Sequence, residues 1–218
     1  SAQAQAGRWR CRLTGEIGLR NTVILGAGSI GLSFCAVFLD AGYAVTLVEP
    51  DGQRRDAARA GIAAQTQAIA DAGLKQGGQG RLETVAVLGD LANADLVIEC
   101  GPENLDVKVA IFRDLIARAG PETVLATASS AIAMSRIVAD PGDQARCLVA
   151  HPVNPPAVLR LIELVPAPGT TPRTVEAARQ CFGEAGFETV ALSREIEGFV
   201  LNRLQGALLR EAYRLVGD

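Results

Sequence analysis

Residues 22–31 read Thr-Val-Ile-Leu-Gly-Ala-Gly-Ser-Ile-Gly, a β-branched apolar run followed directly by three spaced glycines. Such a run predicts a buried strand, and the apolar periodicity of residues 30–41 predicts a helix after the glycines. In a strand–turn–helix unit, Gly26 permits a tight turn, Gly28 lets the backbone approach a pyrophosphate, and Gly31 lets helix and strand pack closely. The stretch therefore predicts a dinucleotide-binding βαβ unit.

The start of this helix and the end of the next predicted strand supply the other parts of a nucleotide site. Backbone N–H groups at Ser29 and Ile30, with the partial positive charge of a helix N-terminus, favour a bound phosphate. Glu49 ends the strand predicted over residues 44–48. It lies about 20 residues beyond the glycines, where an acidic side chain hydrogen-bonds the adenosine ribose.

The same carboxylate bears on which dinucleotide is bound. Glu49 would repel a 2′-phosphate, so we expect the cofactor to be NAD rather than NADP. Arg54 and Arg55 follow closely and leave an alternative open, since nearby arginines can hold that phosphate. The other interpretation of these two residues is solvated charge on the first turns of a helix.

Strand and helix patterns alternate from residue 22 onward. Strands are predicted at residues 22–25, 44–48, 84–88, 96–100, 124–127, 147–150, 161–165 and 189–192, and helices at 30–41, 53–72, 105–119, 171–186 and 198–216. This alternation predicts an α/β fold of the Rossmann type, with a doubly wound, mostly parallel sheet. A weak boundary near residue 194 separates a nucleotide-binding domain, residues 21–194, from a final segment, residues 195–218.

Composition excludes several classes of function. Hydrophobic residues make up 49% of the 218-residue chain and mean hydropathy is +0.21, enough for a sizeable core. A net charge of −3 argues against a nucleic-acid-binding surface. The longest apolar runs are strand-length, so we expect no membrane span. Residues 1–20 lack the apolar core of a secretory signal and the chain begins without methionine, so they read as an N-terminal arm or an expression remnant.

The cysteines indicate a reducing compartment. The chain has 5 cysteines without CxxC spacing, and 1 histidine. Dispersed thiols of odd number are typical of a cytoplasmic protein rather than of a disulfide framework. The same scarcity of ligands at zinc spacing predicts no metal site.

His151, the sole histidine, is a candidate base. Oxidation of a secondary alcohol by NAD requires a group that takes the hydroxyl proton as hydride leaves, and histidine suits this near neutral pH. Glu163 lies in the apolar strand predicted over residues 161–165, where a carboxylate without a partner is costly. The two residues are therefore candidates for a proton-transfer pair. A turn histidine and an edge-strand glutamate are the alternative interpretation.

Four stretches have a pattern typical of one enzyme family. They are VIECGPENLDVK at residues 97–108, TASS at 127–130, HPVNPPAVLRLIELV at 151–165 and GFVLNRL at 198–204. On these stretches the chain resembles the L-3-hydroxyacyl-CoA dehydrogenases, and most closely their lambda-crystallin / L-gulonate 3-dehydrogenase branch. The resemblance implies that residues 195–218 form the first helix of an all-helical C-terminal domain that is truncated here.

The resemblance also implies roles for residues around His151. Ser129 and Asn202 would hydrogen-bond the substrate oxygen beside the catalytic His151 and Glu163. Asn154 would shape the histidine loop or contact the substrate. Taken alone, Ser129 equally suits a helix N-cap, since serine is favoured at that position.

Two charged residues correspond to the part of the family site that touches the nicotinamide-side ribose. These are Glu103 and Lys108, which the resemblance implies are cofactor-binding. Their alternative interpretation is an ordinary charged helix start, because a glutamate there also suits the helix dipole.

Three departures from the family pattern are visible. Thr127 and Ala128 stand where the family usually has Asn or Ser followed by Thr. Ala157 and Val158 replace the aromatic residues that commonly follow the Pro-Pro pair. Arg160 replaces a proline of the branch, and either pairs with a carboxylate or a CoA phosphate or is an exposed strand residue. The last two departures leave the substrate open.

The sequence therefore predicts an NAD-dependent oxidoreductase that converts the 3-hydroxy group of a small-molecule substrate, a 3-hydroxyacyl-CoA or a free acid such as L-gulonate, to the 3-oxo product. A non-catalytic, crystallin-like NAD-binding protein and an incomplete enzyme that needs a partner chain are the alternatives. The helix predicted over residues 198–216 has a wide apolar surface, which we expect to be covered by further chain or by a homodimer partner.

Overall fold

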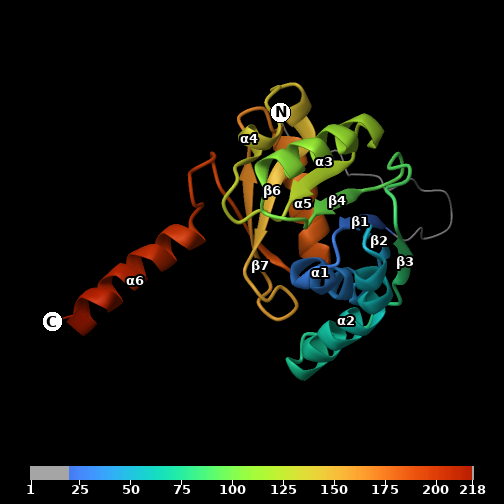
Figure 1. Cartoon of the computed structure of the whole chain (residues 1–218), viewed down its shortest axis with the longest axis horizontal. Helices are drawn as coiled ribbons and strands as arrows, with labels where there is room; N and C mark the ends of the chain where they lie inside the picture. Colours follow the sequence, from blue (N-terminus) through green and yellow to red (C-terminus); the bar gives the residue numbers. More distant parts are fainter. Residues whose placement is uncertain (1–19, 218) are drawn as a thin grey trace, which may run out of the picture.

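The computed structural model of the chain describes residues 20–217. The predicted arm, apart from Arg20, and the thiol of Cys11 lie outside the described residues. Within them, one sheet has helices on both of its faces (Figure 1). The strands are β1 (Asn21–Leu25), β2 (Ala44–Val48), β3 (Arg81–Val85), β4 (Leu96–Glu99), β5 (Val124–Thr127), β6 (Cys147–Pro152), β7 (Leu161–Pro166) and β8 (Glu188–Ala191). The helices are α1 (Ser29–Asp40), α2 (Gly52–Asp71), α3 (Leu105–Arg118), α4 (Met134–Ile137), α5 (Pro172–Glu184), α6 (Leu201–Gly217) and the 3-10 helix η1 (Asp143–Arg146).

The strands lie in the order β3-β2-β1-β4-β5-β6-β7-β8. Those from β3 to β6 in this order run parallel, whereas β7 is antiparallel to β6 and parallel to β8. The chain moves outward from β1 to β3 and then returns to place β4 on the other side of β1. Open α/β sheets bind ligands at the carboxyl ends of the strands beside such a switch. The predicted doubly wound, mostly parallel Rossmann-type sheet is confirmed.

The core lies on both faces of the sheet, because successive side chains of a strand point to opposite sides. In β1, Ile24 packs into the cluster covered by α1, α2 and α5, whereas Val23 packs into the cluster beneath α3 and α4. The rings of Phe34 and Phe38 on α1 meet the ring of Phe182 on α5 in the first of these clusters. All four residues of β4 and of β5 are buried, as expected for strands covered on both faces.

The third strand differs from the prediction. It was expected over residues 84–88 from apolar pattern, but β3 begins at Arg81 and ends at Val85. Its position is set by pairing with β2, in which Arg81 lies opposite Ala44 and Val85 opposite Val48. Residues 86–88 leave the sheet and line a cavity instead.

Two short elements escape sequence prediction, because a single helical turn has no measurable period. These are α4 and η1, each four residues long. The last helix also begins later than predicted, at Leu201 rather than Gly198. The reason is a left-handed turn at Gly198 and Phe199, whose φ values are 72° and 50°.

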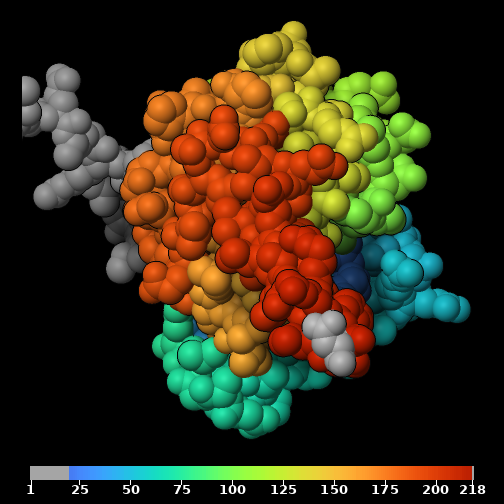
Figure 2. Space-filling view, turned by 90° about the vertical axis from the view of Figure 1, so that its left-hand side faces the viewer, coloured from blue at the N-terminus to red at the C-terminus, as the bar shows by residue number. Residues whose placement is uncertain are grey.

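Helix α6 projects from the body of the molecule (Figure 1), and in Figure 2 it is seen from the side toward which it extends. None of its 17 residues is buried. Its exposed large apolar side chains are Leu204, Leu208, Leu209, Tyr213, Leu215 and Val216. Phe199 lies within the helix predicted over residues 198–216, but it is fully buried in the core cluster beneath α3 and α4 and so is not part of this apolar surface. The domain boundary near residue 194 stays a prediction.

Candidate active site

The glycine-rich turn joins β1 to α1 at the switch point of the sheet. Gly26 has a φ of 101°, and a Cβ there would meet the Cys100 carbonyl oxygen at 2.9 Å. A Cβ at Gly31 would lie 2.0 Å from the Gly26 carbonyl oxygen. At Gly28, by contrast, nothing lies within 4 Å of an added Cβ. Packing therefore requires the first and third glycines, while the second borders open space that a pyrophosphate would fill.

Helix α1 starts beside this open space. Ser29 is exposed and Ile30 half-buried in its first turn. No side chain caps the helix at Gly28. The first N–H groups of a helix have no partner within it, so those of α1 are available to an anion.

Glu49 follows β2 and is only 5% exposed. Its Oε2 accepts a hydrogen bond from the Ala27 N–H at 2.8 Å, and its Oε1 accepts one from the Asp51 N–H at 3.0 Å. The carboxylate therefore holds the glycine turn in place. Each carboxylate oxygen has a second lone pair, so both remain able to accept from a ribose hydroxyl.

A cavity of about 830 Å³ opens beside Glu49 and the glycine turn. Its apolar wall comes from Val48, Pro50, Val87, Leu88, Val107 and Ile111. Cys100 also lines it, and burial, followed by the charge of Glu99, raises the pKa of that thiol well above its usual value, so it stays neutral. An apolar slot, a buried acid and an uncapped helix N-terminus fit the adenosine and pyrophosphate of a dinucleotide.

The two arginines after Glu49 are placed differently. Arg55 Nη1 donates to the carbonyl oxygens of Glu49 and Pro50 at 2.8 and 3.2 Å, so its guanidinium is engaged with backbone. Arg54 lines the cavity. Of these two arginines, Arg54 is therefore the one along the nucleotide cavity, where Glu49, which disfavours a 2′-phosphate, also lies.

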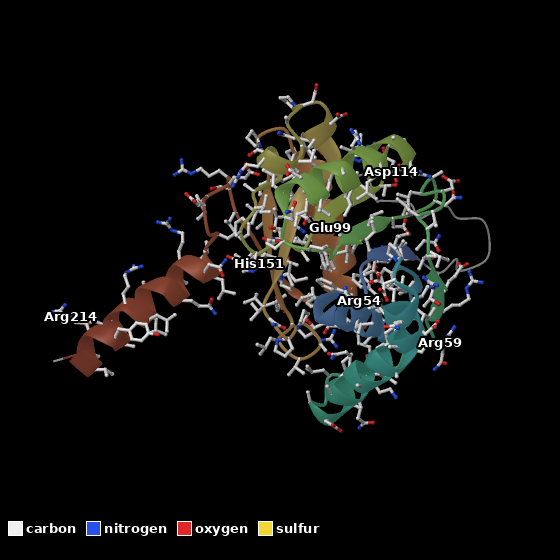
Figure 3. The ribbon with its side chains drawn as sticks, in the orientation of Figure 1. Arg54, Arg59, Glu99, Asp114, His151 and Arg214 are labelled. Atoms are coloured by element: carbon white, nitrogen blue, oxygen red, sulfur yellow. The ribbon has the colours of Figure 1, made fainter. Side chains whose placement is uncertain are left out.

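A buried ion pair lies at the end of β4, where Figure 3 labels Glu99. Lys108 Nζ lies 2.7 Å from Glu99 Oε2, and these side chains are 1% and 0% exposed. Thr127 Oγ1 donates to the same carboxylate oxygen at 2.6 Å, and the Gly101 N–H donates to the other at 2.6 Å. Thr127, a departure from the family pattern, thus completes the hydrogen bonding of a charge that would be costly to bury alone.

Glu103 connects this ion pair to the loop that contains Ser129. Its Oε2 lies 3.6 Å from Lys108 Nζ, and its Oε1 accepts from Ser129 Oγ at 2.6 Å and from the backbone N–H groups of Ser130 and Ala131. Burial alone would raise the pKa of Glu103, but the Ser129 hydrogen bond, the Lys108 charge and the two N–H groups together lower it. Glu103 is therefore held as an anion.

Ser129 is fully engaged in this arrangement. Its hydroxyl donates to Glu103 and accepts from the Ile132 N–H at 2.8 Å, a cap-like contact as in its alternative interpretation. Asn202 lies nearby, because its Nδ2 donates to the Ser130 carbonyl oxygen at 2.7 Å. The structure thus brings Ser129 and Asn202 to one loop, while their contact with a substrate oxygen stays a prediction.

His151 and Glu163 are direct cross-strand neighbours in the antiparallel pair of β6 and β7. His151 lies inside β6 rather than just past it, since the strand extends to Pro152. His151 Nδ1 and Glu163 Oε2 are 2.7 Å apart. Both residues are buried, His151 at 6% and Glu163 at 4% exposure. The other oxygen of Glu163 accepts from the N–H groups of Val200 and Leu201, each at 2.9 Å. Figure 3 shows His151 on the side of the body from which α6 departs.

The loop between β6 and β7 is partly structural. Asn154 is exposed, as a substrate contact would require. Ala157 is fully buried in the core, however, and Arg160 is half-buried. Arg160 donates to the carbonyl oxygens of Ala157 and Ala185 at 3.0 and 3.1 Å, and its guanidinium lies 5.4 Å from the ring centre of Phe187. Arg160 is thus half-buried in the loop before β7, so its interpretation as an exposed strand residue is wrong.

Sequence reasoning missed Glu99, and it treated Thr127 only as a departure. A signal for Glu99 was present, since it ends an otherwise apolar strand, as Glu163 interrupts one. Phe199 was also missed, because its ring lies 5.4 Å from that of His151 only through a left-handed turn that a helical period conceals.

The chain matches the family model for the 3-hydroxyacyl-CoA dehydrogenase NAD-binding domain over residues 21–196. Lambda-crystallin of Oryctolagus cuniculus is 34% identical over 205 residues, which cover 91% of this chain and 64% of that protein. L-carnitine dehydrogenase of Streptomyces griseus is 37% identical over 202 residues, which cover 92% of this chain and 60% of that protein. The chain thus spans less than two thirds of the length of these relatives.

A solved structure of 3-hydroxybutyryl-CoA dehydrogenase from Escherichia coli matches 92% of this chain and 43% of its own, with a TM-score of 0.81 and 28% identity. These comparisons confirm the family resemblance and NAD as the cofactor. Within residues 20–217, no cluster of three or more potential metal ligands occurs, and no helix is long and apolar enough to span a membrane.

Proposed function

Because the chain belongs to the 3-hydroxyacyl-CoA dehydrogenase family, we propose that the protein oxidises the 3-hydroxy group of a free hydroxy acid or a 3-hydroxyacyl-CoA to the 3-oxo product. The observation that supports this most directly is the buried contact of 2.7 Å between His151 Nδ1 and Glu163 Oε2. NAD, when bound, supplies the hydride acceptor. The residues of the chain supply binding, orientation and a place for the proton.

The proposed base is His151. An ionised carboxylate can only accept hydrogen bonds, so Nδ1 of the neutral ring keeps its proton and donates a hydrogen bond to Glu163. Nε2 is then unprotonated and accepts the proton of the substrate hydroxyl. The Glu163 carboxylate stabilises the imidazolium that forms, and its two backbone donors keep it in place for that role.

We assign the substrate oxygen to Ser129 and Asn202, with Asn154 as a further substrate contact. The bond from Asn202 to the Ser130 carbonyl supports a shared role, since it joins α6 to the Ser129 loop. For the Ser129 hydroxyl to donate to substrate, it must turn from Glu103.

On the nicotinamide side, Glu103 is the proposed ribose contact, because its side chain is 40% exposed. The Lys108 side chain is only 1% exposed. Its proposed role in cofactor binding is therefore indirect: Lys108 Nζ, 3.6 Å from Glu103 Oε2, keeps the Glu103 carboxylate in position.

The test follows NADH absorbance after L-gulonate, L-carnitine or 3-hydroxybutyryl-CoA is added to the protein and NAD. We expect one class of substrate to produce NADH, and the His151→Gln variant to produce little with the same substrate. Turnover of the free acids alone assigns the substrate to that class. NAD binding without turnover of any of the three contradicts the proposal and favours a non-catalytic NAD-binding protein.

We further propose that the protein is cytoplasmic and forms a homodimer through its C-terminal helical region. The free thiols of Cys35, Cys100, Cys147 and Cys181 support the first assignment. The second is supported by α6, on which Leu208 is 72% and Tyr213 75% exposed. Light scattering at tens of micromolar is expected to show self-association that Leu208→Glu weakens. A clean monomer contradicts the homodimer.

A further inference from the structure

Phe199 lies in the turn that leads from the sheet to α6, in an uncommon backbone conformation. It is the single non-glycine residue between residues 20 and 217 with a positive φ, at 50°, and it follows Gly198 at 72°. A bulky side chain is rarely found in the left-handed region. Such conformations persist where surrounding contacts hold them, and they gather at functional sites.

The side chain of Phe199 is held by the residue that we assign as the base. It is fully buried, and its ring centre lies 5.4 Å from that of His151, with the two planes at 52°. Tilted ring pairs at this separation attract one another in addition to the area that they bury. One side of the imidazole is thus packed against Phe199, while Nδ1 contacts Glu163.

The same turn fixes the partner of the imidazole. The N–H groups of Val200 and Leu201, the two residues after Phe199, both donate to Glu163 Oε1 at 2.9 Å. Only the other oxygen of Glu163 contacts His151. The left-handed conformation of Phe199 thus accompanies two contacts: the Phe199 ring packs on His151, and the N–H groups of Val200 and Leu201 bind Glu163. A regular helix through Phe199 would not combine these contacts in the same way.

We propose that Phe199 is a positioning residue for His151, because its ring holds the imidazole in the orientation in which Nδ1–H donates to Glu163 and Nε2 stays unprotonated. The purpose of that orientation rests on the proposed function, but the orientation itself does not. The competing explanation is that Phe199 only fills the core.

The single histidine of the chain allows a direct test. Two-bond ¹⁵N–¹H correlation spectra report which ring nitrogen has the proton, and any histidine signal from residues 20–217 belongs to His151. We expect one tautomer, protonated at Nδ1, and a proton resonance of His151 displaced by the ring current of Phe199. In Phe199→Leu we expect a mixture of tautomers and loss of that displacement.

Phe112→Leu is the matched control. Phe112 is also fully buried and lies in the same core cluster, but on α3 in regular helix. Both substitutions should lower the melting temperature, whereas only Phe199→Leu should change the His151 spectrum. If Phe199→Leu does not fold, Phe199→Met, which keeps more of the side-chain volume, is read by the same criteria.

Three outcomes are distinguishable. A tautomer change in Phe199→Leu alone supports the proposal, and turnover should then fall about 10–100-fold while NAD affinity is kept. A wild-type His151 spectrum in Phe199→Leu, or equal changes in Phe199→Leu and Phe112→Leu, overturns it. If the Phe199 effect is present but the unaltered protein oxidises no hydroxy substrate, the proposed function fails and the positioning role stands.

Discussion

Helices α1 and α6 begin in a similar way but differ in what covers them. A buried glutamate binds backbone next to each start: Glu49 accepts from the Ala27 N–H before α1, and Glu163 accepts from the Leu201 N–H at the start of α6. Eight of the 12 residues of α1 are buried, compared with none of the 17 residues of α6. A carboxylate thus holds the backbone at or just before each helix start, whereas side-chain packing decides how much of the helix is buried. Helix α1 is held along its length, and α6 at its beginning.

The comparison separates the proposed proton transfer, at the anchored start of α6, from cofactor binding, at the start of α1. We therefore expect His151→Gln to lower kcat by about 10²–10⁴-fold, because a general base is lost, while the Kd for NAD stays near that of the unaltered protein. Stopped-flow measurement of NADH formation and calorimetric titration with NAD check the two parts. The double variant with Glu163→Gln should be less impaired than the product of the single effects. Turnover near that of the unaltered protein in His151→Gln contradicts the mechanism.

The difference in burial predicts a difference in stability. Phe34 on α1 is fully buried against three other aromatic rings, so Phe34→Ala should lower the free energy of unfolding by about 3–5 kcal/mol. Leu208 on α6 is 72% exposed, so Leu208→Ala should change it by less than about 0.5 kcal/mol. Urea unfolding at a concentration where the protein is monomeric measures both. A loss above about 1 kcal/mol in Leu208→Ala would mean that α6 is covered in solution.

The anchor of α1 can be tested through the cofactor. Glu49→Ala removes the charge-assisted hydrogen bond expected between this carboxylate and the adenosine ribose, which contributes about 1.5–3 kcal/mol. NAD affinity should therefore fall roughly 10–100-fold. NADP affinity should change little or improve, since a repulsive carboxylate is removed. Asp51→Ala, which removes the cap of α2 two residues away, is the control and should leave NAD affinity nearly unchanged. Unchanged NAD affinity in Glu49→Ala contradicts the role assigned to this end of β2.

The smallest expected effect concerns Glu103, a third carboxylate that binds backbone N–H groups. Its folded-state pKa lies below the unfolded value of 4.5, so its contribution to stability is present above about pH 4.5 and is lost as the pH falls through the folded pKa. Glu103→Gln should therefore be less stable than the unaltered protein near neutral pH, by an amount that shrinks in acid. Thermal melts across this range measure the difference. Asp114→Asn, at an exposed ion pair of α3, is the control and should show little effect.

The glycine turn and Glu49 could be predicted from sequence because their geometry is local. Gly26 and Gly28 lie in the turn between β1 and α1, Gly31 lies in the first turn of α1, and Glu49 directly follows the next strand, β2. Residue type and resemblance predicted the pair of His151 and Glu163, but they did not predict what brings the two side chains together. That cause is the antiparallel register of β7, which a pattern of alternating strands and helices does not reveal.

Other features of the structure depend on strand pairing, on side-chain partners or on a single backbone conformation, and the hydrophobic periodicity of the sequence contains no information on these. The start of β3 is set by Arg81, whose N–H donates to the Tyr43 carbonyl oxygen, and not by the apolar run that follows. The burial of Phe199 follows from a positive φ at an ordinary residue. The buried carboxylate of Glu99, on β4, is hydrogen-bonded by Lys108 of α3 and Thr127 of β5. For β3 and for Glu99 the deciding partner lies elsewhere in the fold.

The antiparallel pairing of β6 and β7 also has a consequence for folding kinetics. His151 and Glu163 are only 12 residues apart, so a single hairpin brings them together. The β1–β4 pairing beside the cofactor cavity instead joins residues such as Thr22 and Leu96, after two helices and two strands have intervened. Loop closure costs more entropy as the loop lengthens, and non-local pairings form more slowly. We therefore expect the hairpin of β6 and β7 to form early during folding and the nucleotide site to be completed late.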